Sequence, residues 1–349
     1  MSTNNPSPKP YALRSRLFQT SAAAALVVIV LALAYLGARA QPVALNAPAD
    51  KLSIAVPVLP QHALMHVAAA KGYFSEEGLN VAFLPANHGV MAIGLLTQGK
   101  ADLAVAAEVP FVISVMNGEA LGIAATMLRV SSVHAIIARR DRGVGAPRDL
   151  AGKRVGASFG TSGEYFLCAF LIRHKLAPDS VNLVDVPPGE IAQALATGTI
   201  DAATTWYPHV RDAQDALGGN ALSFTADTAY TQSVVVIGRS ELLTRRANAV
   251  KKLLRAMLKA ERFMRSNPEE TLNLVAAWLK IDVNALRRTW KQLDFRVDML
   301  QSQLITLEDE ARWAMARGYA ATGPVPNFLP HLHLDALLAV ESERVTVLH

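Results

Sequence analysis

The sequence carries an internal repeat, and this feature constrains the fold more than any other. Residues 99–104 read GKADLA and are followed by Pro110, whereas residues 198–203 read GTIDAA and are followed by Pro208. In each copy the Gly can end a helix, the Asp follows a turn, small apolar residues suit a strand, and the Pro can open the next helix. The offset of about 100 residues is the size of a domain and far exceeds a solenoid period. The repeat therefore predicts two similar α/β lobes.

Short apolar runs alternate with amphipathic stretches in each copy of the repeat. Strands that alternate with helices of this length are typical of a mostly parallel sheet with helical crossovers. In the first copy we expect alternating strands and helices at residues 52–58, 63–71, 80–84, 90–98, 102–106 and 110–117. In the second copy we expect them at residues 154–157, 162–175, 181–186, 191–197, 202–205 and from 208 onward.

Two extended apolar runs, at 133–138 and 233–238, follow the two copies. Their β-branched residues fit strands that cross between the lobes, which would give two hinge connections and a cleft. Residues 241–317 have a helical pattern, and we expect this C-terminal extension to pack on the first lobe. The expected domains are a leader at 1–40, a tether at 41–50, a first lobe formed by 51–136 together with 238–349, and a second lobe at 137–237.

The first forty residues have the pattern of an export signal. An uncharged run at 19–38 follows Arg14 and Arg16, and the triplet ARA at 38–40 overlaps its end. Small residues in this spacing suit a signal peptidase, so cleavage before Gln41 is one interpretation. The run is also long enough to span a bilayer, so an uncleaved anchor is the other. In both cases we expect the remainder of the chain to lie outside the cytoplasm, in the periplasm.

Charge content argues against a nucleic-acid-binding protein, and cysteine content excludes a fold held by internal disulfides. The chain has 34 Lys and Arg against 29 Asp and Glu, and four of the basic residues lie in the leader, which has no acidic residue. The rest is almost neutral, whereas a nucleic-acid partner requires a basic stripe on the folded body. The single cysteine, Cys168, lies in an apolar run and cannot form an internal disulfide. We expect it to be buried, and we expect the hydrophobic core to hold the fold.

Ligands of open α/β sheets bind where strands end and helices begin, because free N–H groups and the helix dipole favour negative charge there. The loop at 158–164, SFGTSGE, is the most informative of these junctions. Gly160 lets backbone N–H groups approach a ligand, and Thr161 and Ser162 supply hydroxyls. We expect this loop to contact an acidic group of the ligand. Helix capping without a ligand is the alternative.

Other side chains at these junctions are further candidates. His62 and His88 can donate to an anion, and Trp206 can form the wall of a pocket for an apolar or planar part of a ligand. Glu108 and Glu164 lie in the first turns of helices and can meet an amino group of a zwitterionic ligand. Each of these residues also has an ordinary alternative role, in solvent, in the core, or next to a helix dipole.

A hydrolase is a chemical alternative. Residues 156–160, GASFG, fit the G-x-S-x-G motif of a nucleophile elbow, with Ser158 as the nucleophile. A triad would also need an acid and then a histidine, for which the later residues are Asp201 or Asp227 and His331 or His333. Asp201, however, begins a strand, at the wrong end of the sheet for a catalytic acid. We therefore expect no catalytic residue.

Histidine spacing raises the question of a metal. His62 and His66 are four residues apart on a helix, and His331 and His333 are two apart. Zinc needs three or four ligands, and neither pair is accompanied by a recognisable zinc motif. We expect no metal and no cofactor.

With these residues in view, the chain resembles the extracytoplasmic substrate-binding proteins of ABC importers, in the nitrate, sulfonate and taurine group related to thiamine-pyrimidine-synthesis proteins. The segment AKGYFSEEGLNV at 70–81 carries the most specific part of the resemblance. Residues 99–110, DLAGKRVG at 149–156, and residues 198–206 support it. Together these segments cover most of residues 51–240.

The resemblance implies a type II periplasmic-binding-protein fold, in which two lobes close on a small ligand and dock on an inner-membrane permease that works with an ATPase. By matching loops, it implies ligand contacts at Gln61, Asn87, His88, Glu108, Thr161, Ser162 and Trp206. We expect a monomer that is not an enzyme and that binds a small organic or inorganic anion of the sulfonate, taurine or nitrate class. No arginine and two glutamates stand on the expected cleft loops, so a neutral heterocycle such as a thiamine pyrimidine precursor is an alternative. An anchored sensory module is a third use of the same cleft.

Overall fold

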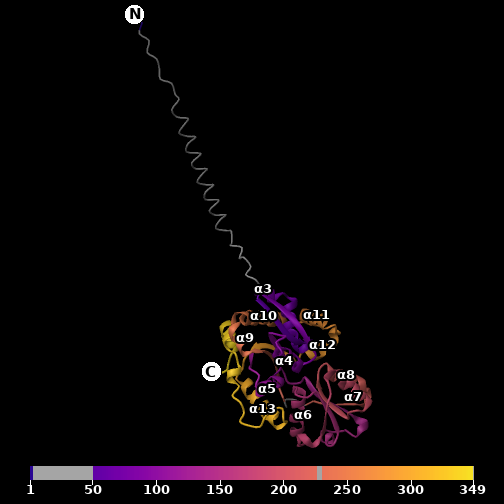
Figure 1. The fold of residues 1–349 in the computed structure, drawn as a ribbon. Helices are drawn as coiled ribbons and strands as arrows, with labels where there is room; N and C mark the ends of the chain where they lie inside the picture. The colour runs from indigo at the N-terminus through magenta and orange to yellow at the C-terminus, as the bar shows by residue number, and fades with distance from the viewer. Residues whose placement is uncertain (3–49, 226–229, 349) are drawn as a thin grey trace. The chain divides into compact units, whose positions relative to one another are not determined.

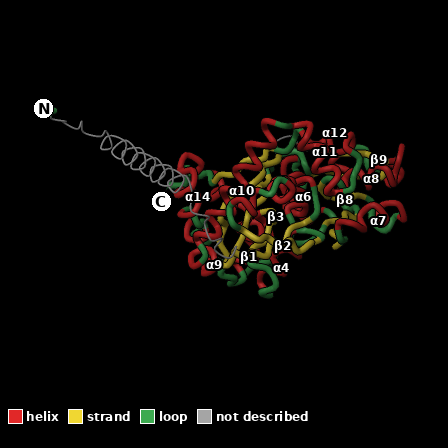
Figure 2. The backbone as a smooth tube through the Cα atoms, turned by 90° about the horizontal axis from the view of Figure 1, so that it is seen from above, coloured by secondary structure: helices red, strands yellow, loops and turns green. Residues whose placement is uncertain are grey.

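The structure, a computed structural model, describes residues 1–2, 50–225 and 230–348. The expected leader and tether therefore lie outside the described residues, apart from residues 1–2 and 50. Within the described part of the chain, no helix is long and apolar enough to cross a membrane. Residues 50–348 contain two sheets, each surrounded by helices (Figure 1, Figure 2).

Lobe 1 is built on a six-stranded sheet with the order β11-β4-β10-β3-β1-β2. Strands β2, β1 and β3 are parallel, whereas β10 is antiparallel to both β3 and β4, and β11 is antiparallel to β4. The strands are β1 (Asp50–Pro57), β2 (Leu79–Ala86), β3 (Leu103–Ala107), β4 (Leu121–Val130), β10 (Gln232–Arg239) and β11 (Asp294–Asp298). The helices of the first repeat copy are η1 (Pro60–His62), α2 (Ala63–Ala70), α3 (Tyr73–Glu76), α4 (Gly89–Thr97) and α5 (Glu108–Met116).

Lobe 2 is built on a five-stranded sheet with the order β7-β6-β8-β5-β9. Strands β7, β6 and β8 are parallel, and β5 is antiparallel to both β8 and β9. The strands are β5 (His134–Arg139), β6 (Arg154–Ala157), β7 (Asn182–Asp185), β8 (Ala202–Trp206) and β9 (Ala221–Phe224). The helices are α6 (Ser162–Arg173), α7 (Ile191–Thr197) and α8 (His209–Leu217).

The two sheets share one topology, as the internal repeat predicts. Each has three parallel strands from its own repeat copy and then an antiparallel strand that directly follows a passage of the chain between lobes: β10 in lobe 1 and β5 in lobe 2. The expectation of mostly parallel sheets is therefore correct only for these three-strand portions. The sheets are mixed because the two passages bring the chain back in the opposite direction.

The apolar runs at 133–138 and 233–238 do not themselves span the lobes, contrary to the expectation. β5 lies wholly in the sheet of lobe 2, and β10 lies wholly in the sheet of lobe 1. The chain passes between the lobes just before each of them, after Val130 and after Phe224. The expected domain boundaries at 137 and 238 consequently fall inside β5 and β10.

The C-terminal extension packs largely on lobe 1. Helix α10 packs against α2, α3 and α14, and α13 packs against α5. The helices of this extension are α9 (Ser240–Arg245), α10 (Ala247–Ser266), α11 (Pro268–Leu279), α12 (Val283–Trp290), α13 (Ser302–Ala316) and α14 (Asp335–Glu341). The extension is helical, as expected, except for β11, which pairs with β4 at the edge of the sheet.

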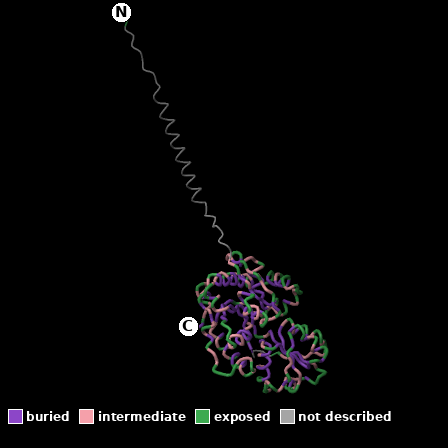
Figure 3. The backbone as a smooth tube through the Cα atoms, viewed as in Figure 1, coloured by how far each residue is buried: buried purple, intermediate pink, exposed green. Residues whose placement is uncertain are grey.

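The cores explain why several strands are continuous apolar runs rather than alternating ones. In β5, Ile136 packs with the aromatic side chains of α6 on one face of the sheet, and Ile137 packs with α7 on the other face. A strand that is covered on both faces needs apolar residues at every position. Buried residues accordingly fill the interior of both lobes (Figure 3). Cys168 is one of them, as expected, and it packs with Val109 and Trp313.

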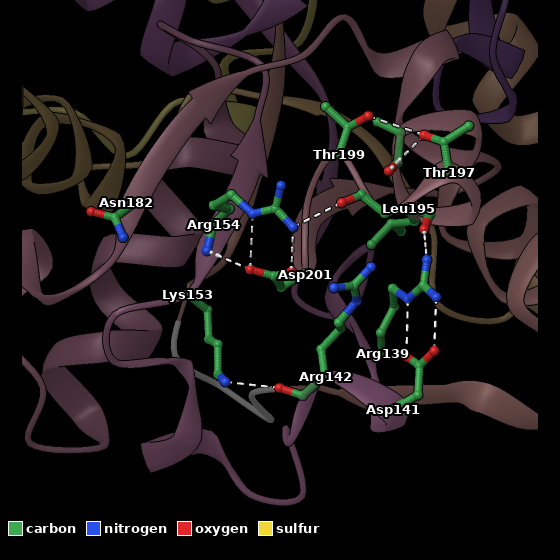
Figure 4. A network of polar contacts seen from close by, with 12 residues as sticks. Arg139, Asp141, Arg142, Lys153, Arg154, Asn182, Leu195, Thr197, Thr199 and Asp201 are labelled. Carbon is green, nitrogen blue, oxygen red and sulfur yellow. Dashed lines mark hydrogen bonds and ion pairs between the residues drawn. The ribbon is translucent and has the colours of Figure 1, made fainter.

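One aspartate plays the same structural role in each repeat copy. Asp102 accepts the backbone N–H of Ser53 in β1 at 2.8 Å, and its own N–H donates to the carbonyl of Ser53 at 3.0 Å. Asp201 does the same with Arg154 in β6, at 3.0 Å and 2.8 Å, and its carboxylate also forms an ion pair with the guanidinium of Arg154 (Figure 4). The repeated Asp lies just before a strand in each copy, and there it holds the backbone of the first strand of that copy.

Candidate functional site

A small pocket, with a cavity volume of about 50 Å³, lies between the two lobes. Strand ends, helix starts and the residues that follow the passages between the lobes all contribute to it. We call it the cleft pocket. Its lining residues are Pro57, Leu59, Gln61, His62, His88, Gly89, Val90, Ala106, Ala107, Pro110, Val133, Thr161, Ser162, Trp206, Gln232 and Val234.

The cleft pocket brings together six of the ten predicted site residues. They come from four junctions, two in each lobe, that are far apart in the sequence, and they are Gln61, His62, His88, Thr161, Ser162 and Trp206. The other four predicted residues do not line it. Asn87 is exposed, and Glu108, Gly160 and Glu164 are bonded within the protein.

Two helix N-termini face the cleft pocket from opposite lobes. Helix α4 begins at Gly89 after His88, and α6 begins at Ser162 after Thr161, and all four residues line the pocket. A Cβ atom at Gly89 would lie only 2.9 Å from the Cβ of Ala106 in β3, so glycine allows α4 to begin directly against the strand. Free N–H groups at both helix starts favour an electron-rich ligand group between them.

No Asp, Glu, Lys or Arg is found among the described residues that line the cleft pocket. Its two histidines are neutral near pH 7. Burial, with a smaller contribution from nearby His66, lowers the pKa of His62 to about 3. Burial also lowers the pKa of His88, although the carboxylate of Asp185 opposes the change. The pocket therefore offers dipoles and hydrogen bonds rather than formal charges.

Glu108 uses its carboxylate to hold the strand that follows the second passage between lobes. Both carboxylate oxygens accept the backbone N–H of Ser233, at 2.8 Å and 3.0 Å. The side chain is completely buried, and burial raises the pKa of Glu108 to about 7 although the bond from Ser233 opposes that rise. Glu310 on α13 lies next to it, and burial together with the charge of Glu108 raises the pKa of Glu310.

Glu164 joins the start of α6 to the C-terminal extension. Its carboxylate accepts from Nε of Arg317 at 3.2 Å, from the hydroxyl of Tyr319, and from the backbone N–H of Gly160 at 2.9 Å. The hydroxyl of Tyr319 also accepts from the N–H of Gly160, at 3.1 Å. Neither Glu164 nor Glu108 therefore presents a carboxylate to an amino group in the cleft pocket.

The hydroxyl groups of the 158–164 loop serve different partners. Thr161 donates to the carbonyl of Ser158 at 2.6 Å, which ties the loop to itself. Ser158 donates to the carbonyl of Val186 at 2.8 Å. Ser162 donates to Oε1 of Gln232 at 2.7 Å, across the cleft from lobe 1. Of the three hydroxyls, only that of Ser162 contacts another side chain that lines the pocket.

The structure does not assemble the triad that the G-x-S-x-G motif would need. Ser158 has no hydrogen bond to a histidine among the described residues, and Asp201 is engaged by Arg154. Nδ1 of His331 donates to the carbonyl of Leu121 in lobe 1. Asp227 lies outside the described residues. Within the described part of the chain, no group of three or more His, Cys, Asp or Glu could hold a metal ion.

Two polar residues near the pocket are absent from the sequence-based site. Gln232, the first residue of β10, lines the cleft pocket, and His134, the first residue of β5, lies 3.2 Å from the hydroxyl of Ser162 through its Nε2 atom. Both follow a passage between lobes rather than the carboxyl end of a parallel strand. The site was expected at strand-to-helix junctions, so these two residues were not predicted. The sequence signal that points to them is their position at the start of the apolar runs at 133–138 and 233–238.

A family model described as "NMT1/THI5 like" matches residues 59–271. A protein of Brucella abortus (strain 2308), provisionally named as a binding protein, is 26% identical over 220 residues, which are 62% of this chain and 67% of that one. The taurine-binding periplasmic protein of Escherichia coli (strain K12) is 23% identical over 219 residues, 61% of this chain and 65% of the relative.

A solved structure with the same arrangement is the alkanesulfonate-binding protein of Xanthomonas axonopodis pv. citri bound to MOPS. It superposes with a TM-score of 0.72 at 16% identity, over 82% of this chain and 99% of that one. The likeness shows that the chain has the two-lobe periplasmic binding protein fold with two mixed sheets. These relatives are named as binding proteins, not as enzymes.

Proposed function

This chain belongs to the NMT1/THI5 like family, and from that membership and the cleft pocket we propose that it is the solute-binding protein of an ABC importer. One observation carries the proposal: the cleft pocket is lined from both lobes of a fold whose two connections can act as hinges. A solute held there contacts both lobes, so its binding favours the closed arrangement that a permease can recognise. The permease and its ATPase are the partners of this proposal.

We propose that the solute is a small molecule with an anionic head group, of the sulfonate class. The starts of α4 and α6 supply N–H donors from opposite sides, and helix dipoles of this kind favour an anion by about 0.3 to 1 kcal/mol each, or more where the site is partly buried. Leu59, Val133 and Val234 give the remainder of the pocket an apolar surface, and Trp206 adds an aromatic one. An organic tail fits this surface better than a hydrated inorganic ion does.

A neutral heterocycle is the second candidate, and a specific observation favours it. The described lining has no cationic side chain to neutralise an anion, and both of its histidines are uncharged near pH 7. A planar ring with carbonyl or ring-nitrogen acceptors could stack on Trp206 and accept the same hydrogen bonds. The two candidates differ in charge, so their binding responds differently to ionic strength.

We propose a periplasmic location. The pattern of residues 1–40 supports export, and the taurine-binding relative is named as a periplasmic protein. Cleavage before Gln41 and retention by an uncleaved anchor both remain compatible with this proposal. Fractionation of cells that express the full chain, followed by mass determination of the product, distinguishes a cleaved protein from an anchored one.

A thermal-shift screen tests the proposed function. The purified protein is heated with ethanesulfonate, taurine, nitrate, bicarbonate, pyrimidines and aromatic acids. A solute present at 100 times its dissociation constant should add about 2.7 kcal/mol of stability, which is readily measured. A shift with a sulfonate supports the first candidate, and a shift with a pyrimidine alone supports the second. No shift with any small molecule would contradict a solute-binding role.

A further inference from the structure

A chain of three side chains crosses the cleft pocket from lobe 2 to lobe 1. Nε2 of His134 lies 3.2 Å from Oγ of Ser162, and Oγ of Ser162 donates to Oε1 of Gln232 at 2.7 Å. All three side chains are buried, with 4%, 5% and 7% of their surface exposed. His134 is further fixed by stacking on Phe166, with ring centroids 5.2 Å apart.

The directions of the two hydrogen bonds between His134, Ser162 and Gln232 follow from the number of protons that these side chains carry. The hydroxyl of Ser162 has one proton, which it gives to Gln232, so toward His134 it can only accept. His134 must then carry its proton on Nε2. Burial lowers the pKa of His134 to about 3, so the ring is neutral and has one N–H group near pH 7.

The arrangement also fixes the carboxamide of Gln232. Its oxygen is occupied by Ser162, and within residues 50–225 and 230–348 its nitrogen has no hydrogen-bond partner. Because Gln232 lines the cleft pocket, its NH2 group is the part left for a solute. If the amide were rotated by 180°, Ser162 would have to accept from Gln232 and donate to His134, and the pocket would instead present a carbonyl oxygen.

We propose that Gln232 determines the specificity of the cleft pocket for solutes with an acceptor-only head group, and that Ser162 and His134 are positioning residues that present its NH2 group. This inference rests on the proposed solute-binding function. The Thr161 hydroxyl donates to Ser158, and the described lining has no carboxylate, so its donors are the Gln232 NH2 group and the two helix starts, and its one carboxamide oxygen without a partner is the buried Oε1 of Gln61. A sulfonate or ring carbonyl satisfies the donors, whereas an ammonium group finds no anionic partner.

Ethanesulfonate and taurine form a matched pair of probes, because they differ only by the ammonium group of taurine. We expect the full chain to bind ethanesulfonate at least about tenfold more tightly, since burying an unpaired ammonium is costly. Gln232→Leu, which removes the NH2 group, should weaken ethanesulfonate binding about tenfold or more. Gln214→Leu, on the exposed face of α8, is the matched control and should leave the affinity unchanged. Equal affinity for the two probes, or unchanged binding by Gln232→Leu, overturns the inference.

A second measurement does not require a solute. Nitrogen-15 NMR of the histidine rings, with the His134 signal assigned by its loss in His134→Phe, reports which ring nitrogen carries the proton. We expect protonated Nε2 in the full chain, a changed Nε2 signal in Ser162→Ala, and an unchanged one in Ser158→Ala and Ser162→Thr, which keeps the hydroxyl. A proton on Nδ1 overturns the inference, because Ser162 would then donate to His134 and Gln232 would turn its oxygen to the pocket.

The two experiments separate the inference from the function on which it rests. If the full chain binds ethanesulfonate but Gln232→Leu binds it equally well, the inference is wrong and solute binding stands. If the full chain binds no small molecule in the thermal-shift screen, the proposed function fails and the inference fails with it.

Discussion

Glu108 holds Ser233 with both oxygens of its carboxylate, at 2.8 Å and 3.0 Å from the backbone nitrogen. Glu108 begins α5, directly after the pocket residue Ala107, and Ser233 lies between the pocket residues Gln232 and Val234. The pair therefore ties a helix start to the strand that follows the second passage between lobes. Its protonation state affects the same part of the molecule that lines the cleft.

This pair predicts a distinctive pH dependence of stability. The pKa of Glu108 is raised from 4.5 to about 7 in the folded protein. Between these values the unfolded chain is ionised while the folded protein keeps the proton, so the contribution of Glu108 to stability falls as pH rises through this window. Glu108→Gln keeps an oxygen for Ser233 and cannot titrate. Denaturant unfolding at pH 5 and pH 8 should show the wild type losing stability relative to Glu108→Gln, and a pH-independent difference would contradict this.

Thr161 lines the cleft pocket, but its hydroxyl proton is committed to the carbonyl of Ser158. We therefore expect Thr161→Ala to lower the free energy of unfolding by about 1 kcal/mol and to change solute affinity by less than about threefold. Unfolding curves and calorimetric titration of the same variant check both numbers. A tenfold loss of affinity at unchanged stability would instead make Thr161 a principal ligand contact.

Tyr319 links the C-terminal extension to lobe 2, because its hydroxyl bonds to Glu164 and Gly160. Tyr319→Phe should loosen the closed arrangement, weaken solute binding about fivefold, and increase the radius of gyration measured by X-ray scattering without solute. Tyr73→Phe is the control, since Tyr73 packs on Phe263 within lobe 1. The wild type should become more compact when a solute binds. Identical scattering of Tyr319→Phe and wild type would argue that this hydroxyl does not hold the lobes together.

Ser158 should behave as a structural residue. Its hydroxyl donates to the carbonyl of Val186 and contacts no histidine among the described residues. Ser158→Ala should cost about 1 kcal/mol of stability and leave solute affinity unchanged, and neither protein should hydrolyse an activated ester above background. Ester turnover in the wild type that disappears in Ser158→Ala would revive the hydrolase hypothesis.

The fold could be predicted largely because the two repeat copies follow local rules. Asp102 and Asp201 mark equivalent turns, and each bonds to the first strand of its own copy. The sequence pattern of β4 and β11 indicates a strand less clearly. β4 is buried along nearly its whole length and has no alternation, and β11 is a short edge strand within a region of helical periodicity. Their pairing is decided by tertiary contacts.

The candidate site could be predicted only where it follows the rule that ligands bind at strand-to-helix junctions. That rule finds His88, Thr161 and Ser162, which line the cleft pocket. It also selects Glu108 and Glu164, because a first-turn carboxylate looks the same whether it meets a ligand or a partner elsewhere in the chain. The partner of Glu164 lies 153 residues away, at Arg317, and that of Glu108 lies 125 residues away. No local pattern reports contacts at such separations.

Calorimetric titration of a cleft-filling variant tests the central claim most directly. Ala107 lines the cleft pocket, and Ala107→Trp would fill much of its volume, whereas Ala196→Trp adds the same side chain at an exposed position of α7. Each folded protein is titrated with the small molecule that gives the largest thermal shift. We predict one solute per chain for wild type and Ala196→Trp, with binding by Ala107→Trp weakened at least about a hundredfold. Unchanged binding by folded Ala107→Trp would place the solute elsewhere and contradict the account.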